Sequence, residues 1–202
     1  MPGIDMLIAN SLSLSIKDNL DSKIEKKIKL NLFKKYGLSI TQAINDFSKV
    51  DKSLKEVFKP DPSSFEKKCL MQIVTIKILN NSYIVTIKEK NLIKDMLKIL
   101  GDDEFLKIIE STISSSSSVP EIINICKLPK TSGYRKIGYL VRHGLLIERG
   151  TELTSKRRSI ERLTTVFEKI NFELNQNHKF VRFGIPKKTM EKSSIFQLIQ
   201  RI

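Results

Sequence analysis

Cationic side chains gather in one stretch of the sequence, from Lys127 to Arg158. This stretch has nine Lys or Arg residues and two Glu residues, a net charge of +7, which is half of the formal +14 of the 202-residue chain. Lys and Arg pair with phosphates and with the guanine edge in the major groove. A basic helix followed by a basic hairpin suits a polyanionic duplex better than a small substrate.

Two helices joined by a short turn are expected to position these cations. Ser118 and Glu121 have the spacing of a capping box, with Pro120 in the first turn, so a helix is predicted to begin there. Leu128-Pro129 ends that helix. Its buried side is expected to consist of Ile122, Ile123, Ile125 and Cys126.

The next helix is predicted over residues 130–143 and is the candidate to enter a major groove. Ile137, Leu140 and Val141 have core spacing, and Tyr134 extends that stripe by one turn. The outer side is then expected to carry the residues proposed to contact DNA: Lys130, Thr131, Ser132, Arg135, Lys136, Tyr139 and Arg142. An ordinary solvated amphipathic helix is the alternative.

A basic hairpin is expected to follow over residues 145–167. His143-Gly144 ends the helix, and strands are predicted at 145–154 and about 158–167, although ERLTTVF could also begin a helix. Arg149 and a cluster at the tip would rest on phosphates or enter a minor groove. The cluster consists of Lys156, Arg157 and Arg158.

The segment ICKLPKTSGYRKIGYLVRHGLLIERG resembles the ArsR-like winged helix-turn-helix of archaeal transcriptional regulators. The matching positions are Cys126, Pro129, Thr131, Ser132, Tyr134, Arg135, Lys136, Ile137, Leu140, Gly144, Leu145 and Leu146. The tail and the segments KKYGLSITQAINDF and SLKEVF also resemble regulators of ammonia-oxidising archaea with an output-type N-terminal domain. The resemblance implies sequence-specific DNA binding, usually as a homodimer. The cysteine-rich motif of arsenic sensors is missing, so metal sensing is not implied.

An α+β fold with two domains is expected: a mostly helical domain with one β-hairpin over residues 1–101, and the winged helix-turn-helix domain over 102–202. In the first domain, residues 1–14 are expected to be a frayed lead before a helix at 15–36 that ends at Gly37. Further helices are predicted from Ser39, from Lys52 to Phe58, from Ser63 to Ile73 and from Lys90 to Leu100. Alternation around Asn80-Asn81-Ser82 predicts the hairpin.

The C-terminal part is expected to add a hairpin and a helix to the wing domain. Residues 170–174 and 179–184 alternate well, and Pro186 begins an amphipathic helix through about 201. Phe172, Phe180 and Phe183 are expected in the core, with stacking on single-stranded bases as the alternative. The serine run at 114–118 is expected to be a flexible connector.

Other function classes find little support in the sequence. Phosphate-binding loops (GxxxxGK[ST] and GxGxxG) and the G-x-S-x-G elbow are missing, so neither an enzyme nor a cofactor is expected. Two His residues without ligand spacing predict no metal site. Cys69 and Cys126 are interpreted as core thiols of a cytoplasmic protein, and no apolar run suits a membrane span. A protein- or RNA-binding module of the transcription machinery or a signalling pathway is the alternative function, and a ligand-sensing regulator is a third.

Overall fold

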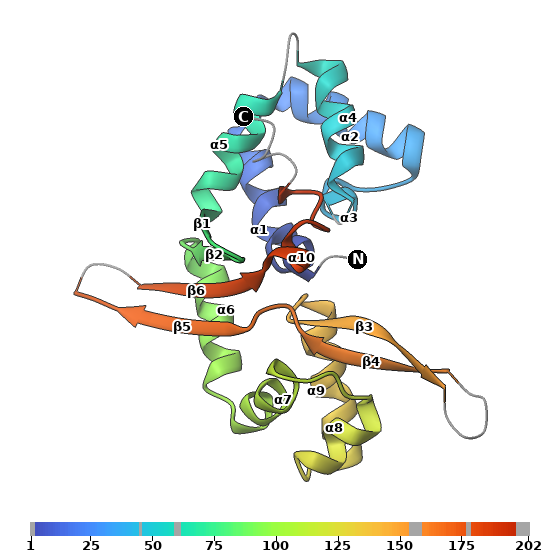
Figure 1. The fold of residues 1–202 in the computed structure, drawn as a ribbon. Coiled ribbons are helices and arrows are strands. Elements are labelled where there is room, and N and C mark those ends of the chain that lie inside the picture. Colours follow the sequence, from blue (N-terminus) through green and yellow to red (C-terminus); the bar gives the residue numbers. More distant parts are fainter. Residues whose placement is uncertain (1–2, 45, 59–61, 154–158, 177–178, 197–202) are drawn as a thin grey trace.

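The computed structural model describes residues 3–44, 46–58, 62–153, 159–176 and 179–196. Within these residues the fold is α+β, as expected, with ten helices, a four-stranded sheet and a two-stranded sheet. Two β-hairpins project in opposite directions from a helical body (Figure 1).

The N-terminal helices form a bundle: α1 (Gly3–Asn19), α2 (Ser22–Tyr36), α3 (Ile40–Ile44), α4 (Phe47–Val57) and α5 (Ser63–Ile73). The expectation of a frayed lead was wrong, because α1 is the most buried helix of the bundle. Ile4, Leu12 and Ile16 are at most 2% exposed. The expected helix at 15–36 is divided at Asp21, whose side chain accepts a hydrogen bond from the Lys23 backbone N–H and starts α2.

The larger sheet joins two hairpins that are distant in the sequence. The first consists of β1 (Val74–Leu79) and β2 (Ser82–Ile87), and the second of β5 (Lys169–Leu174) and β6 (Lys179–Pro186). All pairs are antiparallel in the order β1-β2-β6-β5. The C-terminal hairpin was expected to pack on the wing domain. It pairs instead with β2, so the sheet crosses the expected division after residue 101.

The chain between these hairpins forms a second unit. Its helices are α6 (Lys90–Leu100), α7 (Asp103–Ile113), α8 (Val119–Ile125) and α9 (Lys130–Arg142), and the hairpin consists of β3 (Leu146–Leu153) and β4 (Ser159–Thr165). The serine run is not a free connector. Ser117 is buried and exchanges two backbone hydrogen bonds with Leu163 of β4, which forms an isolated antiparallel bridge to this hairpin.

The start of α1 also contacts parts of the chain outside the bundle, at Gly3 and at Asp5. At Gly144, in the turn between α9 and β3, a Cβ atom would lie 2.0 Å from the Gly3 carbonyl oxygen, so the two backbones touch. On the other side, the Asp5 carboxylate accepts hydrogen bonds from Ser193 and from the backbone N–H of Ser194 at 2.8 Å.

The expected C-terminal helix is interrupted within the described residues. It begins as α10 (Lys187–Met190), residues 191–195 are not helical, residue 196 is helical again, and the rest of the expected range lies outside the described residues. No described helix has the length and apolarity needed to cross a membrane.

Candidate nucleic-acid interface

The outer face of α9 is a polar and cationic stripe. Its exposed side chains are Lys130, Thr131, Tyr134, Arg135 and Arg142. The sequence contains no Asp or Glu between Glu121 and Glu148, so no carboxylate of this segment weakens the positive potential. Tyr134 was expected in the core, but its side chain is 54% exposed and belongs to this outer stripe.

Lys136 does not lie on the outer face, contrary to expectation. It is 8% exposed, and its ammonium pairs with the carboxylate of Asp102 and, at 3.1 Å, with that of Glu104. The same nitrogen lies 4.6 Å from the centre of the Phe105 ring. Lys136 therefore fastens α9 to the start of α7 and is not available to a ligand on the outer side.

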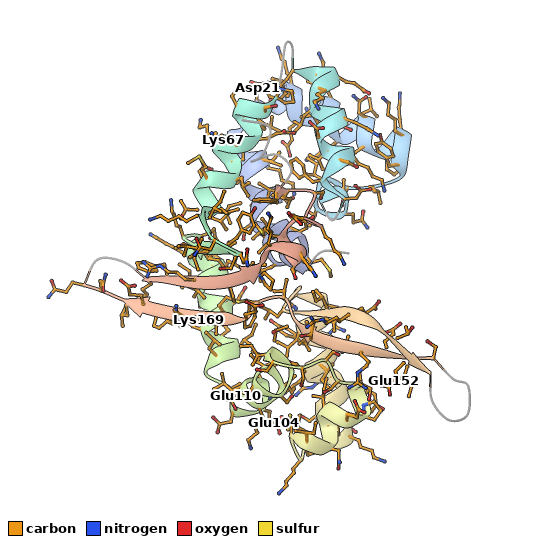
Figure 2. All side chains as sticks on the ribbon, in the orientation of Figure 1. Asp21, Lys67, Glu104, Glu110, Glu152 and Lys169 are labelled. Atoms are coloured by element: carbon orange, nitrogen blue, oxygen red, sulfur yellow. The ribbon has the colours of Figure 1, made fainter. Side chains whose placement is uncertain are left out.

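The ionisation of these three groups is coupled. The hydrogen bond from Lys136 lowers the pKa of Asp102. Hydrogen bonds from Ser132 and then from Lys136 lower the pKa of Glu104. Burial alone would lower the pKa of Lys136, but its bonds to both carboxylates outweigh burial and raise it. All three groups are charged at neutral pH. Glu104, labelled in Figure 2, belongs to the first turn of α7, and its carboxylate reaches Lys136 of α9.

Two more expected contact residues face α7. The Ser132 hydroxyl donates to a Glu104 carboxylate oxygen at 2.8 Å. The Tyr139 ring is half-buried, stacks on His143 at 3.8 Å and lies 5.4 Å from Phe105. Of the seven residues expected on the outer side of α9, four are therefore exposed there, and Ser132, Lys136 and Tyr139 hold the helix in place.

The turn before α9 brings α8 and α9 close together. A Cβ atom at Gly133 would lie 2.6 Å from the Ile123 side chain, so only glycine allows this crossing. Lys127 has a φ of 52°, the left-handed conformation that usually favours glycine. Ile125 was expected to be buried but is 60% exposed. A groove of about 410 Å³ lies beside the turn, lined by Pro120, Ile123, Asn124, Lys127, Leu128, Lys130 and Tyr134.

The β3–β4 hairpin confirms the two strands expected for the wing. Arg149 is exposed beside Gly150, where the register shifts. The expected tip cluster of Lys156, Arg157 and Arg158 lies outside the described residues.

Arg162 of β4 links the hairpin to the serine run and to α8, a role that the sequence reasoning missed. It donates to the Ser116 carbonyl oxygen at 2.6 Å and pairs with Glu121 of α8 at 3.2 Å. It also pairs with Glu152, which stands on the projecting hairpin (Figure 2). An arginine in a strand facing an acidic helix start is the signal that could have revealed it.

Comparisons with protein-family models, with curated proteins and with solved structures found no match for this chain. Among the described residues, no group of three or more His, Cys, Asp or Glu side chains could hold a metal ion. Cys69 and Cys126 are both buried and free, as expected, and burial raises the pKa of the Cys69 thiol.

Proposed function

We propose that the chain is a sequence-specific, double-stranded DNA-binding transcription regulator in which α7 to β4 form a winged helix-turn-helix. One observation carries the proposal: α9 presents an acid-free stripe of cations and hydrogen-bond donors, while its opposite face is fixed to α7 by ionic bonds. A rigid helix with such a face has the chemistry to read base edges in a major groove.

Each exposed residue of the interface has a proposed role. Arg135, near the middle of the stripe, donates to guanine O6 and N7, and Arg142 and Lys130 bind phosphates on either side. Arg149 and the tip of the β3–β4 hairpin bind the backbone or an adjacent minor groove. Lys127 fits this proposal because a lysine occupies a backbone conformation in which glycine would be less strained, at the edge of the same surface.

The test is a selection from random duplex DNA with purified protein at near-physiological salt. A recovered motif supports the proposal. A palindrome with half-sites about 34 Å apart, one turn of DNA, would add that the protein binds as a homodimer. Recovery of no motif, with binding that disappears as salt rises, would contradict sequence-specific recognition.

A protein-binding module is the second candidate, favoured by the groove beside the α8–α9 turn. The exposed Tyr134 lines this groove together with Pro120 and Leu128, which suits an apolar side chain of a partner. The salt dependence of binding separates the two candidates. A DNA complex weakens steeply with salt because counterions are released from the phosphates, whereas an apolar protein contact changes little.

A further inference from the structure

A second cationic site lies far along the chain from α9, in a cavity between α6 and the turn that joins β5 to β6. The cavity has a volume of about 640 Å³. Its lining combines ammonium groups, side-chain amides and apolar side chains: Lys88, Lys90, Lys94, Lys179, Asn175, Gln176, Ile93 and Leu97. Figure 1 shows α6 running beside the β5–β6 hairpin, on the side opposite the β3–β4 hairpin.

None of the described residues that line the cavity is a carboxylate, and the nearby carboxylates on its elements have partners of their own. Glu89 caps α6 by accepting hydrogen bonds from the backbone N–H groups of Asn91 and Leu92. Asp95 pairs with Lys98 at 3.3 Å, and Glu173 pairs with Arg182 at 2.8 Å. The four lysines therefore keep a positive potential that a concave wall concentrates.

The chemistry of the lining defines the class of ligand. Four ammonium groups suit a ligand with more than one negative charge, and the two amides can donate to phosphate oxygens. Ile93 is 4% exposed and Leu97 is half-buried, so they provide an apolar wall for an uncharged part. The volume lies within the range of small-molecule sites. We infer that this cavity binds a small phosphate-bearing molecule, such as a nucleotide.

The position of the cavity also connects it to α9. The helix that carries Lys90 and Lys94 ends at Leu100, and two residues later Asp102 pairs with Lys136 of α9. A ligand that draws α6 toward the β5–β6 turn would shift this anchor and change the affinity for DNA. This second part of the inference rests on the proposed function, whereas binding in the cavity does not.

The test uses inorganic pyrophosphate and ADP as probes of the full chain, with calorimetry at about 0.15 M salt, where loose surface pairing is screened. We expect saturable binding of one ligand per chain. A variant with Lys90→Gln, Lys94→Gln and Lys179→Gln should bind at least about tenfold more weakly. The control loses the same charge from exposed positions of α2, with Lys26→Gln, Lys27→Gln and Lys34→Gln, and should bind as the wild type does.

Absence of saturable binding, or an equal loss in both variants, would overturn the site. Protein–DNA affinity is then measured with and without pyrophosphate. An unchanged DNA affinity would refute the connection to α9, and a loss of DNA affinity in the cavity variant without any pyrophosphate binding would reassign the lysines to the DNA backbone. If pyrophosphate binds through the three lysines but no DNA binds, the proposed function fails and the cavity assignment stands.

Discussion

Substitution of the neighbouring residues Arg135 and Lys136 should have different effects: loss of Lys136 should lower the stability of the protein, and loss of Arg135 should lower its affinity for DNA. Lys136→Met keeps the apolar stem but removes the charge that pairs with Asp102. The lysine side chain is 10% exposed, but the Asp102 carboxylate is 37% exposed, so solvent screens the pair. A hydrogen bond between charged groups contributes about 1.5–3 kcal/mol and an exposed ion pair at most about 1. We therefore expect Lys136→Met to lower the free energy of unfolding by about 1–2 kcal/mol.

Urea unfolding followed by circular dichroism measures this loss, which suits a chain that has no Trp. The matched control is Arg135→Ala, whose exposed side chain should change stability by less than about 0.5 kcal/mol. On the selected DNA site, Arg135→Ala should lose about 1–3 kcal/mol of binding free energy and relax specificity at one base pair. If Lys136→Met unfolds as the wild type does and loses as much DNA affinity as Arg135→Ala, then Lys136 binds DNA and does not hold α9 against α7.

The pH dependence of stability gives an independent check of the same ion pairs. Because the pKa of Asp102 is lowered, its contribution is present above the ordinary carboxyl pKa of about 4 and is lost as the pH falls below it. Because the pKa of Lys136 is raised, its contribution is present below about pH 10 and is lost at higher pH. The stability difference between wild type and Lys136→Met should therefore be constant near neutral pH and disappear in acid. A difference that persists at pH 2 would contradict an ionic origin.

The remaining predictions concern the contacts of α1. Asp5→Ala removes the acceptor of the Ser194 backbone N–H, at a cost of about 1–3 kcal/mol, so hydrogen exchange at that amide should accelerate about tenfold or more; unchanged exchange would show that Asp5 does not hold this segment. Gly144→Ala should destabilise the protein by about 2–4 kcal/mol in urea, because its φ is +70° and the new Cβ would meet the Gly3 carbonyl. The control Gly138→Ala, in mid-helix with only ordinary contact, should stabilise by about 0.5–1 kcal/mol, and similar results for both glycines would refute the close contact.

The sequence was sufficient to predict turns and helix ends, because a few neighbouring residues determine the conformation there. The turn at Asn80 and Asn81, the left-handed Gly37 and the paired Ser118 and Glu121 lie where they were predicted. In each case the residues that satisfy the backbone are within a few positions of one another, so no distant partner is needed.

Helix α1 escaped prediction because it is buried on several sides. Ser13 and Ser15 are buried along with the apolar side chains, so the polar face that marks an amphipathic helix is missing. The pairing of β2 with β6 escaped for another reason. A period of two predicts that a segment is a strand, but it does not identify which strand lies beside it.

Only part of the candidate interface could be predicted, because the contacts of the inner residues of α9 depend on a segment that is distant in the sequence. Lys136 lies three residues after Gly133 and four before Leu140, which are both buried, so helical geometry places it on the inner stripe. The sequence reasoning placed it on the outer side, because the core stripe was drawn through Tyr134, Ile137, Leu140 and Val141. Lysines are rarely buried without a partner. Its partners, Asp102 and Glu104, are more than 30 positions away in the sequence, and only the fold reveals them.

The order of strands in the larger sheet has a consequence for synthesis of the chain. Ser82 pairs with Pro186 and Ile87 with Val181, so β2 gains its second neighbour only after about a hundred further residues have been made. The unit from α6 to β4 depends mainly on nearby contacts and is able to fold while that edge is still open. On the ribosome, the proposed DNA-reading unit would therefore be complete before β6 emerges and pairs with β2.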